Sequence, residues 1–401
     1  MTPVASVPPG AWRALGVATA AFLALFWAWG LLAPLAPDYR DLLALDPVQV
    51  AVFVALPVLL GSLARIPLGA VTDRYGGRRV FAALSLAVVV PLLFLAVVAS
   101  YPLLLVGAFF LGVSGASFAV GVPFVTAWFP PERRGTALGI YGVGTAGTAI
   151  ASFTGPTIVA ATSRSALFLL VAAVLAGTAV LVWTTARDAP DWRPQTLPLS
   201  ARLRAALGLR VTVDLAVLYA ITFGGFVALG AYLPTYLQET YALTTADAAA
   251  RTGGFIVLAV LARPIGGWLA DRYGAPRVLT AGLGVVVVGA LLLASSLTLP
   301  VAAGVFLAIG VALGSGSGAV FALVARRAPA ASVGAITGFV GAAGGLGGFV
   351  PPLVMGVVFQ TTGSFVLGWV LLGLVAAGGL VHTRRRFRPE ATSPADLRTH
   401  P

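Results

Sequence analysis

LARIPLGAVTDRYGGRRV at residues 63–80 and LARPIGGWLADRYGAPRV at residues 261–278 are two copies of one segment, 198 positions apart. In each copy one arginine, Arg65 or Arg263, lies deep in an apolar run, and a charged Asp-Arg-Tyr-Gly turn ends that run. The repeat predicts a chain of two similar halves, each with one arginine in the same place.

The composition around these segments is that of a membrane protein. Of the 401 residues 59% are hydrophobic and only 9% are charged, whereas soluble domains carry about a quarter charged residues. About twelve apolar stretches approach the roughly 20 residues that a helix needs to cross a bilayer. We expect an all-α polytopic membrane protein with 12 transmembrane helices in two pseudo-symmetric six-helix halves. The expected spans are, approximately, 12–33, 48–71, 80–99, 102–127, 135–159, 165–185, 212–237, 253–270, 278–297, 301–324, 332–359 and 364–382.

The polar segments divide the chain. They predict an N-terminal half at 1–186, a cytoplasmic linker at 187–210, a C-terminal half at 211–383 and a cytoplasmic tail at 384–401. Within the linker, residues 199–209 have the pattern of a short amphipathic helix whose arginines reach lipid head groups. Membrane lipid is therefore an expected partner.

The basic residues collect on one side of the expected membrane. A net charge of +12 is compatible with nucleic-acid binding, but 20 of the 25 basic residues fall in loops that share one side. This is the positive-inside pattern. We therefore expect no nucleic-acid partner, an inner (cytoplasmic) membrane location and cytoplasmic termini.

Features of an enzyme are lacking in this sequence. It has no cysteine, which excludes disulfides and thiolate catalysis, and no metal cluster or nucleophile–base pair is recognisable. Residues 142–147 fit GxGxxG, but they follow no strand and lie inside an apolar span, so a dinucleotide site is rejected. We expect no enzyme activity and no cofactor.

Two six-span halves are typical of a transporter that rocks around a site at the membrane midplane. The glycines of two spans repeat as well, at an offset of 199: Gly135, Gly139 and Gly142 match Gly334, Gly338 and Gly341. Such spacing lets helices approach closely in lipid. Close packing is the simplest interpretation, and exposure of backbone to a substrate is compatible with it.

The two embedded arginines point to an anion. An arginine at the bilayer centre costs roughly 2.5–3.5 kcal/mol, and no Asp or Glu lies in the middle of an expected span to offset it. Arg65 and Arg263 each precede an aspartate by eight residues, about 12 Å of helix, which places them near the midplane rather than at an interface. An anion site is favoured over a purely structural role.

A small planar monoanion suits these side chains. Two guanidiniums about 7 Å apart repel by roughly 2–3 kcal/mol at an effective dielectric of 20, and one bound anion relieves much of that. The guanidinium fork donates two parallel hydrogen bonds to a planar oxyanion.

Aromatic side chains are candidates for the walls of a thin slot. Tyr219 and Phe223 are four residues apart, hence on one helix face, and Phe26 and Phe118 lie in spans that can line the same cavity. Such a slot admits a flat ion and rejects a tetrahedral one. The alternative for each ring is ordinary packing.

The motifs resemble those of a known family. The turn DRYGGRR at 73–79 resembles the inner-loop motif of the major facilitator superfamily. RIPLG at 65–69, ARPIGGW at 262–268 and GAAGGLGGF at 341–349 resemble the nitrate/nitrite porter family within it. The resemblance covers nearly the whole chain and implies the major facilitator fold.

The resemblance also implies roles for individual residues. Arg65 and Arg263 would clamp nitrate or nitrite, Tyr219 would add a hydrogen bond, and Phe26, Phe118 and Phe223 would wall the site. Gly142 and Gly144 belong to the first signature of the family. Where that signature has Asn, this chain has Thr145, a shorter side chain with one donor instead of two. The preference between nitrate and nitrite is therefore left open.

The expected mechanism is alternating access by a monomer. Charged residues at the inner ends of two spans would latch those ends, or would simply anchor the topology: Asp73, Arg74, Arg79, Asp271, Arg272 and Arg277. Proton coupling usually needs a titratable group in the pathway, and no Asp, Glu or His lies in the middle of an expected span. Nitrate/nitrite antiport is therefore preferred, with nitrate–proton symport, or carriage of another small monovalent anion, as alternatives.

Overall fold

The computed structural model describes residues 7–194, 200, 204, 208–327 and 333–387. The described part of the chain consists of helices joined by turns and short loops and contains no strand, which confirms the predicted all-α class. The helices are α1 (Ala11–Gly30), α2 (Leu32–Leu43), α3 (Pro47–Leu63), α4 (Arg65–Tyr75), α5 (Gly77–Val97), α6 (Tyr101–Leu111), η1 (Gly112–Ala116), α7 (Ser117–Trp128), α8 (Pro131–Gly142), η2 (Val143–Ala146), α9 (Gly147–Ala161), α10 (Arg164–Thr185), α12 (Arg210–Tyr241), α13 (Thr245–Tyr273), α14 (Ala275–Leu293), α15 (Leu299–Arg327), α16 (Val333–Thr362) and α17 (Val366–Arg386).

The expected membrane spans correspond to these helices. Within the described residues, 11 helical segments are long and apolar enough to cross a membrane. The remaining expected span, at 135–159, is built from α8, η2 and α9, which follow one another without a gap. Most of the expected interfacial helix at 199–209 lies outside the described residues, as does the tail from 388 on. The first residues of the expected tail, 384–386, continue α17.

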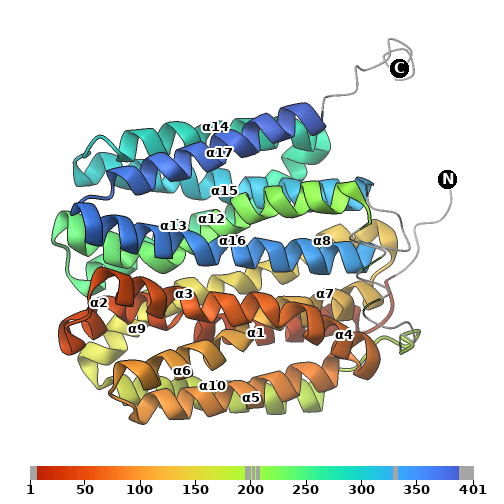
Figure 1. The fold of residues 1–401 in the computed structure, drawn as a ribbon. Helices are drawn as coiled ribbons and strands as arrows, with labels where there is room; N and C mark the ends of the chain where they lie inside the picture. The colour runs from red at the N-terminus through yellow and green to blue at the C-terminus, as the bar shows by residue number, and fades with distance from the viewer. Residues whose placement is uncertain (1–6, 195–199, 201–203, 205–207, 328–332, 388–401) are drawn as a thin grey trace.

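The helices form two bundles that lie against each other. In Figure 1 the helices α1–α10, red to yellow-green, occupy the lower part of the molecule, and α12–α17, green to blue, occupy the upper part. We call them the N-bundle and the C-bundle. They meet where α3 packs on α16, α9 on α13, and α2 on α12, so the interface joins segments far apart in sequence.

The two ends of the bundles are set by local signals. At one end α3 begins with a capping box between Asp46 and Gln49, and this end also carries the turns after α2, α12 and α16. We call it the Arg40 end. At the other, the Arg74 end, the repeated turns stop α4 and α13 at Gly76 and Gly274, with φ of 85° and 88°. Glycine adopts this conformation without strain, and both copies of the repeat use it.

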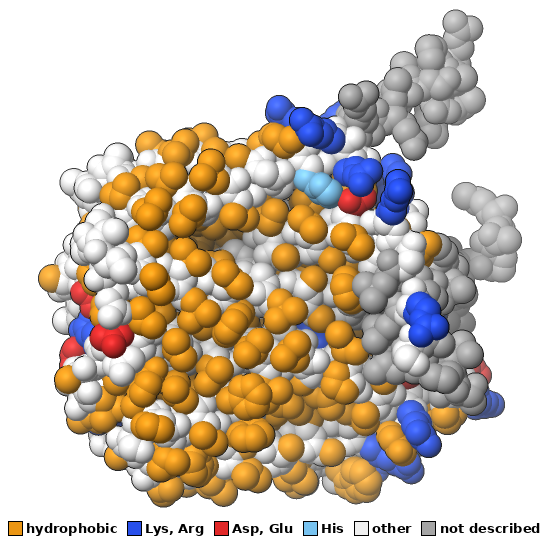
Figure 2. Space-filling model, viewed as in Figure 1, with side chains coloured by type: hydrophobic (Ala, Val, Ile, Leu, Met, Phe, Trp, Pro, Cys, Tyr) orange, Lys and Arg blue, Asp and Glu red, His pale blue; other side chains and the backbone are white. Residues whose placement is uncertain are grey.

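The surface fits a bilayer. In Figure 2 apolar side chains cover the middle of the visible face, while charged side chains gather at its two ends. This distribution is that of a multi-pass membrane protein, whose apolar band faces lipid and whose charged ends face water.

Helix breaks cluster at the level of the embedded arginines. α3 ends at Leu63 and α4 begins at Arg65, while the 3₁₀ segments η1 and η2 interrupt two further spans. Short 3₁₀ stretches within a helix often mark functional places. Here both lie beside an arginine, because Gly115 of η1 contacts Arg65 and Thr145 of η2 contacts Arg263.

Candidate functional site

Arg65 is buried between the two bundles. It is 2% exposed, its Nε donates to the carbonyl of Gly115 at 3.4 Å, and its Nη1 donates to the carbonyl of Gly341 in α16. The guanidinium carbon lies 5.9 Å from the ring centre of Phe118 and 5.4 Å from that of Phe223. An arginine of the N-bundle is thus held by backbone and aromatic groups of both bundles.

Arg263 belongs to the C-bundle and donates a hydrogen bond to the N-bundle. Its Nη1 donates to the hydroxyl of Thr145 in the N-bundle at 3.3 Å, and its guanidinium carbon lies 4.7 Å from the Phe223 ring and 5.2 Å from the Phe226 ring. Its Nη2 is buried and has no hydrogen-bond partner among the described residues. Leaving such a donor unpaired costs about 1–3 kcal/mol, and more when it is charged.

The Phe223 ring brings the two arginines into one site. Because both guanidinium carbons lie within 5.4 Å of its centre, the two charges are close neighbours. No Asp, Glu or His of the described residues has a hydrogen bond or ion pair with either arginine. The arrangement is doubly positive and retains an unused donor.

Thr145 acts as an acceptor in this geometry. Its hydroxyl donates to the carbonyl of Gly142 at 2.8 Å, and a hydroxyl has only one proton to give. Its oxygen is therefore left to accept from Arg263. In this arrangement Thr145 positions the arginine and has no proton left to donate to an anion.

An aromatic stack borders the arginines. Tyr219 and Phe223 are stacked 4.9 Å apart with an interplanar angle of 6°, on the single helix face that their spacing predicts. The edge of Phe321 meets Tyr219, and Phe321 also contacts Phe118 at 6.0 Å. Sequence reasoning missed Phe321 and Phe226, although Phe226 lies three residues after Phe223 on the same helix.

Three other expected site residues lie at different distances from the arginines. Phe26 packs on Phe22 at 4.4 Å and on Trp29, one ring behind Phe118, and has no ring contact with either arginine among the described residues. Gly144 lies against the Phe22 ring, so it serves packing. Gly142 faces open space, because a Cβ there would meet no atom within 4 Å.

The expected latch residues lie at the Arg74 end. Asp271 pairs with Arg326 at 3.1 Å, within the C-bundle, and Arg277 donates to the Tyr273 carbonyl at 3.3 Å. Arg74 stacks on Tyr75, and Arg272 stacks on Trp268 and Tyr273. Asp73 lies in the last turn of α4, and Arg79 is exposed on α5. All six residues lie at the Arg74 end, in or next to the turns that follow α4 and α13.

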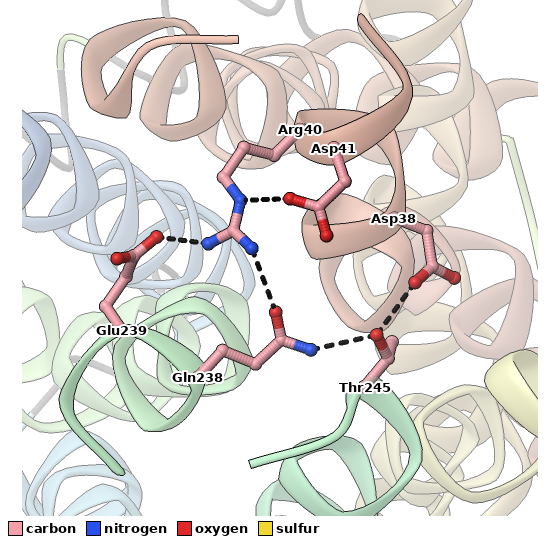
Figure 3. A network of polar contacts seen from close by, with 6 residues as sticks. All are labelled: Asp38, Arg40, Asp41, Gln238, Glu239 and Thr245. Atoms are coloured by element: carbon pink, nitrogen blue, oxygen red, sulfur yellow. Dashed lines mark hydrogen bonds and ion pairs between the residues drawn. The ribbon is translucent and has the colours of Figure 1, made fainter. Parts of the chain in front are cut away.

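At the Arg40 end a polar network joins the bundles (Figure 3). Arg40 of α2 contacts Glu239 and, at 3.5 Å, Gln238, both of α12. Gln238 donates to Thr245 at 2.8 Å, and Thr245 donates to Asp38 at 2.7 Å, which returns the chain of contacts to α2. Sequence reasoning missed this network, which closes the Arg40 end.

An apolar layer lies between this network and the arginines. A cavity of about 40 Å³ remains there, and residues of both bundles line it, among them Trp29, Leu32, Val54, Phe226, Val227 and Ile256. The layer and the network together seal the arginine site from the Arg40 end.

Charge reversal in the network tests this seal. Because the chain has no cysteine, a single cysteine at Ala33 in the layer reports access by its rate of reaction with a water-soluble maleimide. Arg40→Glu is expected to raise that rate by up to about fivefold, since a partly exposed ion pair contributes about 0.2–1 kcal/mol. Arg40→Glu with Glu239→Arg should restore the slow rate. Equal reaction rates in the single-cysteine protein, in its Arg40→Glu variant and in the variant with both exchanges would show that the network does not hold the Arg40 end closed.

Comparisons with known proteins define the class. The Major Facilitator Superfamily profile matches residues 18–352 and 218–399. The human organic anion transporter MFSD10 has a similar structure, with a TM-score of 0.75 over 94% of this chain and all of that chain, at 16% identity. A bacterial homologue of the lysosomal transporter Spinster, solved facing inward, matches at 0.68 over 94% and 95%, also at 16% identity.

The fold and a charged site enclosed between two bundles define a membrane transporter of the Major Facilitator Superfamily. Sequence relatives narrow this class. "Probable nitrate/nitrite transporter NarK2" of Mycobacterium tuberculosis is 45% identical over 92% of this chain and 95% of that protein. "Nitrite extrusion protein" of Bacillus subtilis is 35% identical over 92% of each. This chain belongs to the nitrate/nitrite porter family.

Proposed function

We propose that this protein carries nitrate and nitrite across the cytoplasmic membrane by alternating access, exchanging one anion for the other. The observation that carries the proposal is the buried Nη2 of Arg263, which has no partner among the described residues although a second buried arginine shares the same aromatic ring. A bound anion would pair that donor and offset both charges.

The shape of the site favours a flat ion. The stacked rings of Tyr219 and Phe223 form a planar wall, and the Phe118 ring of the N-bundle lies 5.9 Å from the guanidinium carbon of Arg65. A trigonal anion lies along such a wall while it accepts from a guanidinium fork. The names of the relatives, a probable nitrate/nitrite transporter and a nitrite extrusion protein, support the same substrates.

The hydrogen bonds that the two arginines make in the empty site support exchange. Each arginine donates to an acceptor of the opposite bundle, Arg65 to Gly341 and Arg263 to Thr145. These bonds do not neutralise the two positive charges. When the empty carrier changes between its inward-open and outward-open states, two uncompensated charges therefore lie in a low dielectric, which costs free energy. An anion removes that cost in both directions, which favours a carrier that turns over when loaded.

Orientation follows from charge. The turns at the Arg74 end contain the arginine-rich loops, so we assign this end and both termini to the cytoplasm. The closed Arg40 end then faces outward. We propose that the six charged residues at the Arg74 end latch it in the opposite, outward-open state.

Counterflow in liposomes tests the proposal. Purified protein is reconstituted into vesicles that are empty or loaded with nitrite, and nitrate entry is followed with and without an imposed pH gradient. We expect entry into loaded vesicles at least about tenfold faster than into empty ones, because the empty site returns slowly.

The alternatives give different results in the same vesicles. Entry into empty vesicles driven by the pH gradient would replace exchange by nitrate–proton symport. Absence of nitrate and nitrite entry under every condition, with counterflow of another small monovalent anion, would overturn the substrate assignment.

A further inference from the structure

A second cavity lies wholly within the C-bundle, away from the arginines. It measures about 270 Å³ and lies between α12, α16 and α17. Its lining is almost entirely apolar side chains. We call it the α12–α17 slot. Pockets that hold small molecules usually have volumes of about 300–1,000 Å³, so the slot is close to the size of a ligand site.

The slot runs through one half of the membrane thickness. On α12 its lining extends from Gly225 to Tyr236, which is about 16 Å of helix, close to half of the roughly 30 Å hydrocarbon core. Tyr236 lies near the end of α12 and Trp369 near the start of α17, both at the Arg40 end. The slot therefore reaches from that interface to the middle of the bilayer.

The slot opens sideways toward lipid. Val350 and Val375, which line it, are 55% and 54% exposed. Both belong to membrane-spanning helices whose visible face is apolar in Figure 2. The bilayer, rather than water or the other bundle, is what this opening meets.

One polar atom in the wall has no partner. The Tyr232 hydroxyl is buried without a hydrogen bond among the described residues, and the side chain is only 3% exposed. Within the hydrocarbon region water is not available to satisfy it, so the unpaired hydroxyl is costly. An occupant with a hydrogen-bond acceptor at this depth would remove that cost.

We propose that the α12–α17 slot binds one acyl chain of a phospholipid from the leaflet at the Arg40 end. The chain lies along α12 with its methyl end toward Gly225. Its ester carbonyl lies at the level of Tyr232, where it accepts from the hydroxyl after a small side-chain rotation. A phospholipid supplies both an apolar chain and an acceptor at one end of it.

An acyl chain bound in the α12–α17 slot would affect the helices that carry the transport site. α12 carries Tyr219 and Phe223 within about two turns of Gly225, and α16 carries Gly341. A chain seated between these helices and α17 fixes their separation. This inference concerns lipid binding and stands whether or not the carried anion is nitrate.

Fluorescence quenching tests the slot in the intact protein. Phospholipid with brominated acyl chains is titrated into delipidated protein in detergent. The part of the quenching due to Trp369, one of 8 tryptophans, is the difference between wild type and Trp369→Phe. We expect this part to saturate at about one phospholipid per protein, because a single slot is filled.

Two variants and a control complete the test. Ala228→Leu fills the slot from α12 and should abolish the saturable quenching, as should Val375→Phe, which narrows the exposed mouth and remains informative if Ala228→Leu does not fold. Val288→Leu, on an exposed site of α14, should behave as wild type. Quenching that rises without saturation, or that survives in both slot variants, would overturn the proposal.

Discussion

Replacing Arg263 by glutamine should weaken nitrate binding by at least about 30-fold, and replacing Arg65 by glutamine should do the same. Either change removes one of the two charges that we propose to hold the anion and leaves a neutral amide in its place. Losing one partner of a buried, hydrogen-bonded charge pair costs about 2–5 kcal/mol, and about 2 kcal/mol corresponds to about 30-fold in affinity. Nitrate titration by calorimetry on purified protein measures the change directly.

Lysine variants separate charge from geometry. Arg263→Lys keeps the charge but loses the planar fork, so we expect an intermediate loss of about tenfold. Arg326→Gln is the matched control, because Arg326 is exposed and pairs only with Asp271 of its own bundle in the contacts described above; it should bind nitrate as wild type does. If both glutamine variants bound nitrate within threefold of wild type, the anion would have to bind elsewhere.

The two arginines also show what the sequence predicts well. The repeat places Arg65 and Arg263 at matching depths, and helical periodicity places Tyr219 and Phe223 on one face, as the stacked rings show. Both signals are local, because they depend on spacing along a single span. The fold class follows from composition for the same reason.

Contacts between spans are harder to read from the chain. Nothing in the spacing shows that Arg65 would bond to Gly341 of the other bundle as well as to Gly115 of its own, or that Phe321 would meet Tyr219. Thr145 is the clearest case. Its single proton is committed to Gly142, a fact that depends on the 3₁₀ turn of η2 and changes the hydroxyl from a donor for an anion to an acceptor for Arg263.

The Arg40 network was missed for a related reason. Asp38, Arg40, Gln238 and Glu239 are ordinary loop and helix-end residues when each is considered alone, and the acidic loop suggests only an outer surface. Their function in sealing the bundles appears once α2 and α12 are seen side by side. A charge at a helix end therefore has no predictable partner until the packing of the two bundles is known.

Gly344→Ala should weaken nitrate binding by about 10- to 100-fold, although it adds a single methyl group that touches no anion. A Cβ at Gly344 would overlap the ring of Tyr219 and lie 3.1 Å from Phe223, so the stacked pair must shift relative to the arginines. Overpacking of this kind costs about 1–3 kcal/mol. Gly338→Ala, on the same helix, is the matched control, because a Cβ at Gly338 meets nothing within 4 Å and should leave the affinity unchanged. Equal losses in both variants would assign the effect to the flexibility of α16. A loss confined to Gly344→Ala, in protein that is folded and monodisperse, would show that the position of the Tyr219–Phe223 wall sets the affinity of the site.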